Sequence, residues 1–302
     1  CIMQALKKSV FPGTPGPLVF VIMDGVGIGA HPEGDAVRTA IKPNLDRLAQ
    51  EALVSRLKAH GTAVGLPSDE DMGNSEVGHN AIGCGRVFEQ GAKLVNLAIE
   101  TGSLFQGPAW QEIIGNCRTH RSTLHFLGLF SDGNVHSHID QLKGLLRQAR
   151  REGVTRCRIH ILLDGRDVGE TSALEYVDPF EAFLAEFNAA GADFRIASGG
   201  GRMAITMDRY NANWGMVRDG WKTHVAGEGT RFPSARAAIE AHRAARPGVI
   251  DQDLPPFVVA DAKGEPVGPI RDGDSVVFFN FRGDRAIEIS RAFEDETLKE
   301  FE

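Results

Sequence analysis

The sequence predicts an α/β fold built on a mainly parallel sheet. From about residue 90 onward, short apolar runs alternate with stretches that place apolar side chains on one helical face. Strands that alternate with helices are typical of βαβ units, whose strands run parallel. The apolar runs are continuous rather than alternating, which is typical of strands that are buried on both faces.

The N-terminal part of the chain predicts one strand and one helix. Residues 1–17 end in a segment rich in Pro and Gly and are expected to form an extended lead-in. Residues 18–23 form an apolar run that predicts a buried strand, directly before Asp24. A helix is expected to begin near Pro43. Its apolar face consists of Ile41, Leu45, Leu48, Ala49 and Ala52.

The later part of the chain predicts further strands and the helices between them. One helix is expected to open with Ser137 and Asp140 in the spacing of a capping box. Another is expected to begin at Asp178, with Pro179 in its first turn. Residues 293–302 continue a helical pattern without a cap, and residue 1 is Cys, so we expect a piece of a longer protein. The predicted strands are 124–130, 158–163, 194–197 and 275–281.

Composition narrows the classes of function. The 302 residues carry a net charge of −7, which argues against nucleic-acid and membrane-surface partners. The 4 cysteines form no CxxC pair, so neither a disulfide framework nor a zinc knuckle is indicated and a reducing cytoplasm is expected. No apolar run approaches the ~18 residues that a membrane span needs.

The stretch Met-Gly-Asn-Ser-Glu-Val-Gly-His at 72–79 places a serine before a helix-forming run at 77–82. The free N–H groups and the dipole of a helix start favour a bound anion such as phosphate. Ser75 is therefore a candidate nucleophile that would carry a phosphoryl group. The alternative is that Ser75 or Asn74 only caps the helix.

Polar and charged side chains follow the predicted strands. The carboxyl ends of parallel strands meet at one edge, so these side chains are expected to converge there. Arginines stay charged and bind phosphate or carboxylate in a bidentate fork, so their gathering in an acidic protein predicts a small, multiply anionic ligand. The alternative is that each arginine forms a surface salt bridge. The candidates are Asp24, His136, Arg166, Asp167, Arg202, Arg209, Arg282 and Arg285.

Some of these residues suggest individual roles. His136 and His138 could form a metal pair, but no acid–histidine set lies near them in the sequence, so His136 is favoured as a hydrogen-bond donor to substrate. Asp167 is a candidate base for a substrate hydroxyl, or the partner of Arg166 in a structural pair. Asp24 is a hard-metal ligand or forms an Asx turn. A metal ion would ionise Ser75, although two ligands fall short of the usual four to six.

Residues 25–30 match the dinucleotide fingerprint G-x-G-x-x-A after a predicted strand. That fingerprint opens directly into a helix, whereas residues 31–35 intervene here. Asp24 would also face the pyrophosphate, so a nicotinamide or flavin site is not favoured.

Taken together, these motifs closely resemble the cofactor-independent (2,3-bisphosphoglycerate-independent) phosphoglycerate mutases, which are alkaline-phosphatase-like metalloenzymes. The resemblance implies a partial alkaline-phosphatase-like, metal-binding domain plus an inserted α/β phosphotransferase domain that binds substrate. Residues 1–17 would be the lead-in, 18–88 the N-terminal piece of the former domain and 89–302 all or most of the latter. The matching segments are 21–25, 71–79, 131–138, 163–167, 198–202 with 207–209, and 279–285.

The resemblance also implies an activity: an isomerase of glycolysis and gluconeogenesis that interconverts 3-phosphoglycerate and 2-phosphoglycerate through a phosphoserine at Ser75. The implied enzyme needs no 2,3-bisphosphoglycerate. The resemblance also implies two Mn²⁺ ions, with Mg²⁺, Co²⁺ or Zn²⁺ as alternatives. One of these ions would contact Asp24 and Ser75. Asp167 would move the hydroxyl proton. The implied substrate-binding residues are His136, Arg166, Asp167, Arg202, Arg209, Arg282 and Arg285.

By the same resemblance, the remaining metal ligands and a substrate-binding lysine lie beyond residue 302, so this chain alone is expected to be inactive. We expect a cytoplasmic monomer whose partner is the small-molecule phosphoglycerate. A related metal-dependent phosphomonoesterase or phosphopentomutase is an alternative, against which the His-Ser-His and Asp-Gly-Arg-Asp loops argue. A non-catalytic phosphoglycerate-binding fragment is another.

Overall fold

The computed structural model describes residues 10–301 apart from residues 24 and 28. The chain divides into two compact units, Cys1–Leu57 and Lys58–Glu302. Among the described residues, no helix is both long and apolar enough to cross a membrane. In the first unit the described elements are the 3-10 turn η1 (Pro32–Gly34) and the helices α1 (Ala36–Thr39) and α2 (Pro43–Glu51).

The first unit corrects one prediction and confirms another. The strand predicted at 18–23 is wrong, because these residues are exposed and have no regular backbone pairing. A strand needs a neighbour for its N–H and C=O groups, and the described residues 10–57 contain no strand to provide one. The helix predicted near Pro43 is confirmed as α2. Its predicted apolar face is not buried, since Leu45 and Leu48 are exposed.

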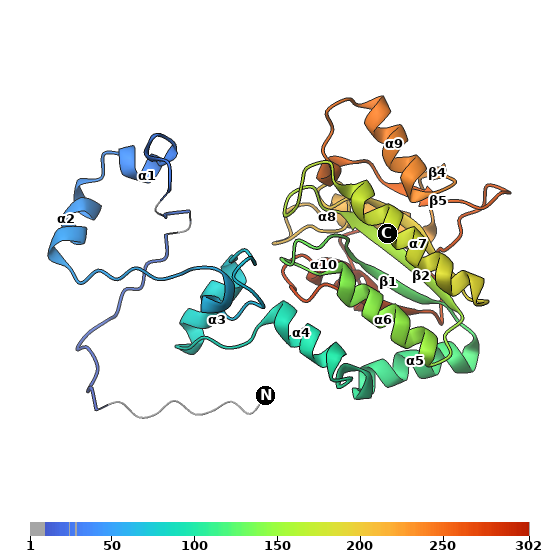
Figure 1. Ribbon diagram of the computed structural model, residues 1–302, viewed down its shortest axis with the longest axis horizontal. Helices are drawn as coiled ribbons and strands as arrows, with labels where there is room; N and C mark the ends of the chain where they lie inside the picture. Colours follow the sequence, from blue (N-terminus) through green and yellow to red (C-terminus); the bar gives the residue numbers. More distant parts are fainter. Residues whose placement is uncertain (1–9, 24, 28, 302) are drawn as a thin grey trace. The chain divides into compact units, whose positions relative to one another are not determined.

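The second unit, Lys58–Glu302, holds the sheet and most of the helices (Figure 1). Its strands are β1 (Leu124–Leu129), β2 (Arg156–Leu163), β3 (Asp193–Gly201), β4 (Thr230–Phe232), β5 (Phe257–Val259) and β6 (Ser275–Phe278). Its α-helices are α3 (Ser75–Cys84), α4 (Gly91–Glu100), α5 (Pro108–His120), α6 (Ile139–Arg151), α7 (Ala173–Ala189), α8 (Trp214–Trp221), α9 (Ala235–Ala245) and α10 (Ile287–Glu294). Shorter helical turns are η2 (Gly61–Val64), η3 (Leu104–Gln106), η4 (Lys222–Ala226) and η5 (Asp251–Asp253).

The six strands form one sheet in the order β4-β5-β3-β2-β1-β6. All neighbouring pairs run parallel except β3 and β5, which are antiparallel. The prediction of an α/β fold with a mainly parallel sheet is therefore confirmed. The sheet places the carboxyl ends of β1, β2, β3 and β6 at the same edge.

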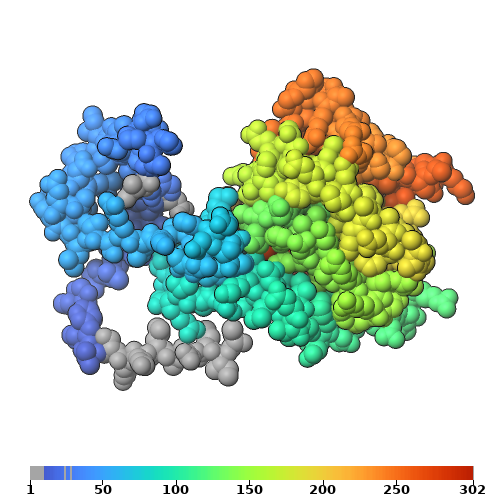
Figure 2. All heavy atoms as spheres, viewed as in Figure 1, coloured from blue at the N-terminus to red at the C-terminus, as the bar shows by residue number. Residues whose placement is uncertain are grey.

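Helices cover both faces of the sheet. Helices α5, α6, α7 and α9 pack on one face. Figure 2 shows the atoms of the chain in the same view as Figure 1. Helices α8 and α10 pack on the other face. Successive residues of a strand face opposite layers: Phe126 belongs to the first core and Leu127 to the second, and both are fully buried. This double burial explains why the strands are continuous apolar runs.

Several element boundaries differ from the prediction. Helix α7 begins at Ala173, not Asp178, and Pro179 lies inside it. The first turn is held by tertiary contacts, because Ala173 and Val177 are buried and the Ala173 N–H donates to Asp251 Oδ2 at 2.8 Å. The predicted capping box is also wrong. His138 caps α6, whereas the Ser137 hydroxyl donates to the Leu129 carbonyl at 2.6 Å.

Three further boundaries differ from the prediction. Strand β6 ends at Phe278, earlier than predicted, and the last helix ends at Glu294 instead of continuing to residue 302. Strand β3 continues through the glycines at 199–201, which the sequence suggested were loop. A Cβ on Gly201 would collide with the Gln252 carbonyl, and one on Gly199 would lie 2.7 Å from the Ile161 oxygen. These glycines permit close approach of other backbone segments.

Gly201→Ala should therefore destabilise the chain by about 3 kcal/mol, the upper range of the cost of overpacking a core. The matched control is Gly115→Ala in α5, where an added Cβ meets nothing within 4 Å. The control should leave stability unchanged or raise it by up to about 1 kcal/mol, since Ala favours helix over Gly. Urea unfolding of both variants measures the difference. Equal midpoints would show that β3 and the loop at Gln252 are not tightly packed.

Candidate functional site

The loops that follow β1, β2, β3 and β6 are tied together by backbone hydrogen bonds. The Phe281 N–H donates to the His136 carbonyl at 2.9 Å, which joins the loop after β6 to the loop after β1. The Arg202 N–H donates to the Leu163 carbonyl at 3.0 Å, which joins the end of β3 to the end of β2. The candidate residues on these loops are therefore neighbours in space, as the parallel sheet predicts.

Asp164 is the centre of the first polar cluster. Its side chain is 1% exposed. It accepts hydrogen bonds from Arg202 Nη1 at 2.8 Å, from the Ser131 hydroxyl at 2.6 Å and from the Asp167 N–H at 3.0 Å. Arg202 Nη1 also donates to Asp167 Oδ2 at 2.5 Å. Asp167 is thus paired with Arg202 and not with Arg166, so the structural pair considered for Arg166 and Asp167 is not formed.

Asp284 is the centre of the second cluster. Its Oδ2 accepts from Arg282 Nη2 at 3.0 Å and from Arg209 Nη1 at 3.2 Å. Its Oδ1 lies 3.0 Å from Arg282 Nε and 3.7 Å from His136 Nδ1. Burial raises the pKa of Asp284, but Arg282, His136 and Arg209 outweigh burial and lower the pKa below its ordinary value. Asp284 is therefore held as a carboxylate.

The histidines of the loop after β1 have different surroundings. His136 is buried, and its Nδ1 has no hydrogen-bond partner. Burial, followed by the charges of Arg202 and Arg282, lowers the pKa of His136 to about 3, against the opposing effect of Asp284. A neutral imidazole at pH 7 carries one N–H to donate. The His138 side chain instead accepts from the Asp140 N–H at 3.1 Å as the cap of α6.

Two arginines of the site, Arg285 and Arg166, form no ion pair with a carboxylate of the described residues. Arg285 is buried and donates from Nη1 to the Met207 carbonyl at 2.6 Å, and no ion pair joins it to the described residues. Burial, then the charges of Arg209 and Arg202, lower its pKa. The buried Arg202 Nε has no hydrogen-bond partner, and the exposed Arg166 forms no ion pair within the described residues. Because an uncompensated buried cation is costly, this arrangement favours an anionic ligand.

Ser75 is the first residue of α3, and its hydroxyl does not cap the helix. Asn74 is the cap, since its Oδ1 accepts from the Val77 N–H at 3.2 Å. Ser75 is exposed, and its Oγ lies 3.2 Å from His79 Nδ1. The same Nδ1 lies 2.7 Å from the Ser75 carbonyl oxygen, which can only accept a hydrogen bond. His79 Nδ1 is therefore the donor and is not placed to accept the Ser75 proton.

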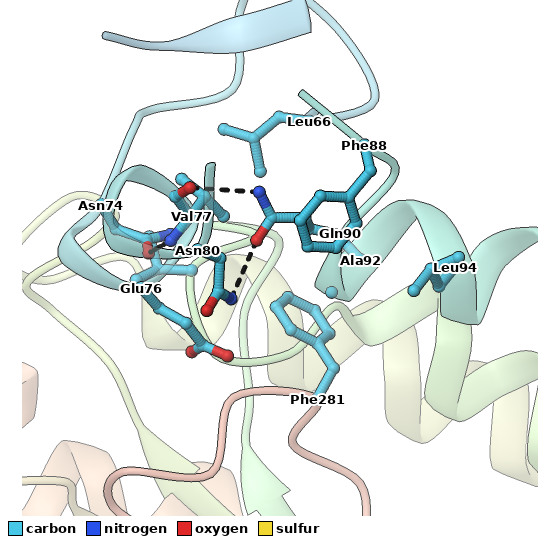
Figure 3. A pocket seen from close by; sticks show the side chains of 12 residues that line it. Leu66, Asn74, Glu76, Val77, Asn80, Phe88, Gln90, Ala92, Leu94 and Phe281 are labelled. Atoms are coloured by element: carbon cyan, nitrogen blue, oxygen red, sulfur yellow. Dashed lines mark hydrogen bonds between the residues drawn. The ribbon is translucent and has the colours of Figure 1, made fainter. Parts of the chain in front are cut away.

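The segment that carries Ser75 packs against the loops of the arginines. A pocket of about 170 Å³ lies beside α3. Gln90 and Phe281 are among the side chains that line it (Figure 3). The Gln90 amide donates to the Val77 carbonyl at 3.1 Å and accepts from Asn80 at 2.9 Å (Figure 3).

Two polar contacts also cross from this segment to the loops. Glu76 Oε2 lies 3.6 Å from Arg282 Nε, and Asn134 donates to Asp71. Burial raises the pKa of Glu76, and Arg282 partly offsets the increase. No contact joins Ser75 itself to an arginine of the described chain.

The metal prediction rests on two oxygen donors. The Ser75 hydroxyl and the Asp24 carboxylate are hard donors that suit Mn²⁺ or Mg²⁺. Asp24 lies outside the described residues. Within the described part of the chain, no three His, Cys, Asp or Glu side chains are grouped to hold a metal. The donors at hand therefore fall short of the about six that these ions take.

Comparisons with known proteins show which protein family the chain resembles. The family model described as "BPG-independent PGAM N-terminus" matches residues 95–302. The chain is 58% identical to the probable 2,3-bisphosphoglycerate-independent phosphoglycerate mutase of Leptospira interrogans, over 99% of this chain and 55% of that protein. It is 50% identical to the 2,3-bisphosphoglycerate-independent phosphoglycerate mutase of Trypanosoma brucei brucei, over 94% of this chain and 52% of that protein.

A solved structure shows the same fold. A crystal structure of Leishmania mexicana phosphoglycerate mutase at low cobalt concentration is similar, with a TM-score of 0.87 and 49% identity. The similarity covers 93% of this chain and 51% of that one. The chain thus spans about half the length of the curated relatives it matches.

Proposed function

The chain belongs to the family of BPG-independent phosphoglycerate mutases, and from this premise we propose that the whole protein interconverts 3-phosphoglycerate and 2-phosphoglycerate. The observation that carries the proposal is the buried guanidinium of Arg285, which has no carboxylate partner among the described residues, together with the unpartnered Nε atom of Arg202. Phosphoglycerate carries a phosphate and a carboxylate, the anions that arginines bind in a fork.

In the proposed reaction, the arginines bind the two anionic groups and the neutral His136 donates a hydrogen bond. Ser75 Oγ, in its ionised form, forms a bond to phosphorus while the bond from phosphorus to the substrate's 3-oxygen breaks, and Asp167 gives a proton to that oxygen. The glycerate then reorients, its 2-oxygen attacks phosphorus and the bond to Ser75 Oγ breaks. Asp167, oriented by Arg202, accepts the hydroxyl proton before the second transfer. The arginines stabilise the dispersed charge of each transfer.

We also propose that Mn²⁺ is the metal, with Asp24 and Ser75 among its ligands and no 2,3-bisphosphoglycerate required. A bound divalent ion favours the ionised hydroxyl and makes it a stronger nucleophile. The described residues do not complete such a site, so no step above is assigned to the metal. The division at residues 88 and 89, the glycolytic role, the cytoplasmic location and the monomeric state belong to the same proposal.

Product analysis tests this function. The full-length protein is incubated with Mn²⁺ and 3-phosphoglycerate, without 2,3-bisphosphoglycerate, and the products are followed by ³¹P NMR. We expect 2-phosphoglycerate to form up to equilibrium with no release of inorganic phosphate. Release of phosphate would indicate a phosphomonoesterase, and conversion of ribose 1-phosphate to ribose 5-phosphate would indicate a phosphopentomutase. Binding of 3-phosphoglycerate without conversion would indicate a binding protein.

A further inference from the structure

The partly buried Asp284 differs from the fully buried Asp164 in the groups that hold its carboxylate. Asp164 is bound by backbone N–H groups and the Ser131 hydroxyl as well as by Arg202, so it fixes the loop conformation. The partners of the Asp284 carboxylate among the described residues are all cationic or imidazole groups: Arg209, Arg282 and His136. The Asp284 side chain is 20% exposed, against 1% for Asp164.

The pairing around Asp284 is also incomplete. Oδ2 receives two well-directed hydrogen bonds, from Arg209 and Arg282. Oδ1 lies close to Arg282 Nε, but both atoms are buried without a satisfied hydrogen bond. His136 Nδ1, 3.7 Å from Oδ1, also lacks one. A buried polar group without a partner costs free energy, so these atoms remain available to a better-placed oxygen.

Asp284 contacts the same kinds of side chain that would bind an anionic ligand. A carboxylate that contacts two guanidinium groups and an imidazole is what these side chains would offer to a phosphate or to the carboxylate of a glycerate. The neighbouring Arg285 and Arg166 form no ion pair with the described residues. The site thus has one anion subsite that Asp284 occupies and one that no carboxylate of the described chain occupies.

We propose that Asp284 is an internal counter-anion that orients Arg209 and Arg282 and yields them only to a ligand with two anionic groups. The inference rests on the proposed function for the identity of that ligand. An anion with one charged group gains too little binding free energy to displace Asp284. A ligand that also binds Arg285 and Arg166 gains enough binding free energy to do so. Asp284 therefore sets how much binding free energy an anion needs in order to occupy the site, and it is a positioning residue.

Asp284→Asn tests the proposal, because it removes the charge and keeps the size. Dissociation constants of inorganic phosphate and of 3-phosphoglycerate are measured by calorimetry at constant ionic strength. The full-length protein is used in a Ser75→Ala background, which prevents turnover. We expect phosphate and 3-phosphoglycerate each to bind about 10-fold more tightly, because neither ligand then has to displace a carboxylate from Arg209 and Arg282. The matched control is Asp295→Asn, which removes an equal charge from an ion pair with Arg291 at 3.0 Å. It should change neither constant.

The sign of the change in binding separates the two hypotheses. If Asp284 only holds the fold together, Asp284→Asn will loosen both arginines and weaken phosphate binding, and the inference is overturned. Asp284→Ser repeats the phosphate measurement if the first variant unfolds. If the parent protein does not bind 3-phosphoglycerate, the proposed function fails, while the phosphate measurement still decides the role of Asp284.

Discussion

Replacing Ser75 with Ala in the full-length protein is expected to reduce turnover of 3-phosphoglycerate by about 10⁴-fold or more. Loss of a nucleophile removes the covalent route, and such losses are among the largest that single substitutions cause. The dissociation constant of 3-phosphoglycerate should change by less than about 3-fold, because the substrate contacts are made by the arginines. Steady-state kinetics and calorimetry measure the two quantities.

In this structure, the Ser75→Ala substitution should remove the hydroxyl without disturbing the fold. Asn74 caps α3, so Ala at the first helical position removes no capping hydrogen bond and helix α3 should persist. His79→Ala is the matched control. Its Nδ1 is oriented to the Ser75 carbonyl, so removal of the imidazole should reduce turnover by no more than about 10-fold. Turnover that survives in Ser75→Ala would disprove the nucleophile. A total loss in His79→Ala alone would make the histidine the reactive group.

The sequence predicted the sheet well because its strands are buried on both faces. Strands β1 and β2 lie within two residues of their predicted bounds, since the adjacent side chains of Phe126 and Leu127 are both apolar and both buried. The strand predicted at 18–23 has the same apolar character, yet it does not form in the described structure. Apolar composition alone does not make a strand, which also needs a neighbouring strand to pair with.

The errors at α7 and β3 share a cause. Local preference predicts that a helix begins at a proline and that a strand ends at a run of glycines. In the structure the buried Ala173 turn precedes Pro179, and Gly201 packs against Gln252 inside a strand. Contacts between segments far apart in the sequence decided both cases, and local sequence does not record them.

The sequence indicated the arginines of the candidate site and Asp167, but not its two central carboxylates, Asp164 and Asp284. An arginine at the end of a strand can be noticed one residue at a time, because its charge needs an explanation in an acidic chain. Asp164 and Asp284 stand inside the same motifs but gained no role, since Asp is common in loops. Their significance lies in pairings such as Arg209 with Asp284, 75 residues apart in the chain. The alternation of Arg and Asp in these motifs was the available signal.

Acid should unfold this chain steeply, because three buried histidines form one hydrogen-bonded chain. His125 Nδ1 is 2.9 Å from His160 Nε2, and His160 Nδ1 is 2.7 Å from Ser198 Oγ. Ser198 Oγ in turn lies 2.7 Å from His224 Nδ1. The chain ends at Asp274, 3.3 Å from His125 Nε2, and at Thr206, 3.0 Å from His224 Nε2. With one proton on each imidazole, every donor meets an acceptor.

An added proton would place two donors against each other and a charge in the core. Burial lowers the pKa of His125 to about 4, with partial compensation by Asp274, and the pKa of His224 to about 3. Burial, then the neighbouring histidines, also lower the pKa of His160. In the unfolded chain the pKa of each is about 6.5.

The sign of the effect follows from these pKa values. Between pH 6.5 and about 4 the unfolded chain binds more protons than the folded chain, so stability is complete above pH 6.5 and is lost as pH falls. Each histidine contributes up to about 1.4 kcal/mol per pH unit, and the three together about 4. A fall from pH 7 to 5 should therefore remove about 5 kcal/mol, comparable to the stability of a whole domain.

Urea unfolding of the 302-residue chain between pH 7.5 and 5 measures this slope. That range lies above the ordinary pKa values of Asp and Glu, so histidines dominate it. His224→Gln keeps a donor and an acceptor but cannot titrate. Its free energy of unfolding should therefore depend less steeply on pH, by the amount that corresponds to about one proton taken up on unfolding. His120→Gln, at the exposed end of α5, should keep the parent slope. A midpoint that stays constant from pH 7 to 5 would mean that the core accommodates charged imidazoles. The one-proton network would then not be what holds these strands together.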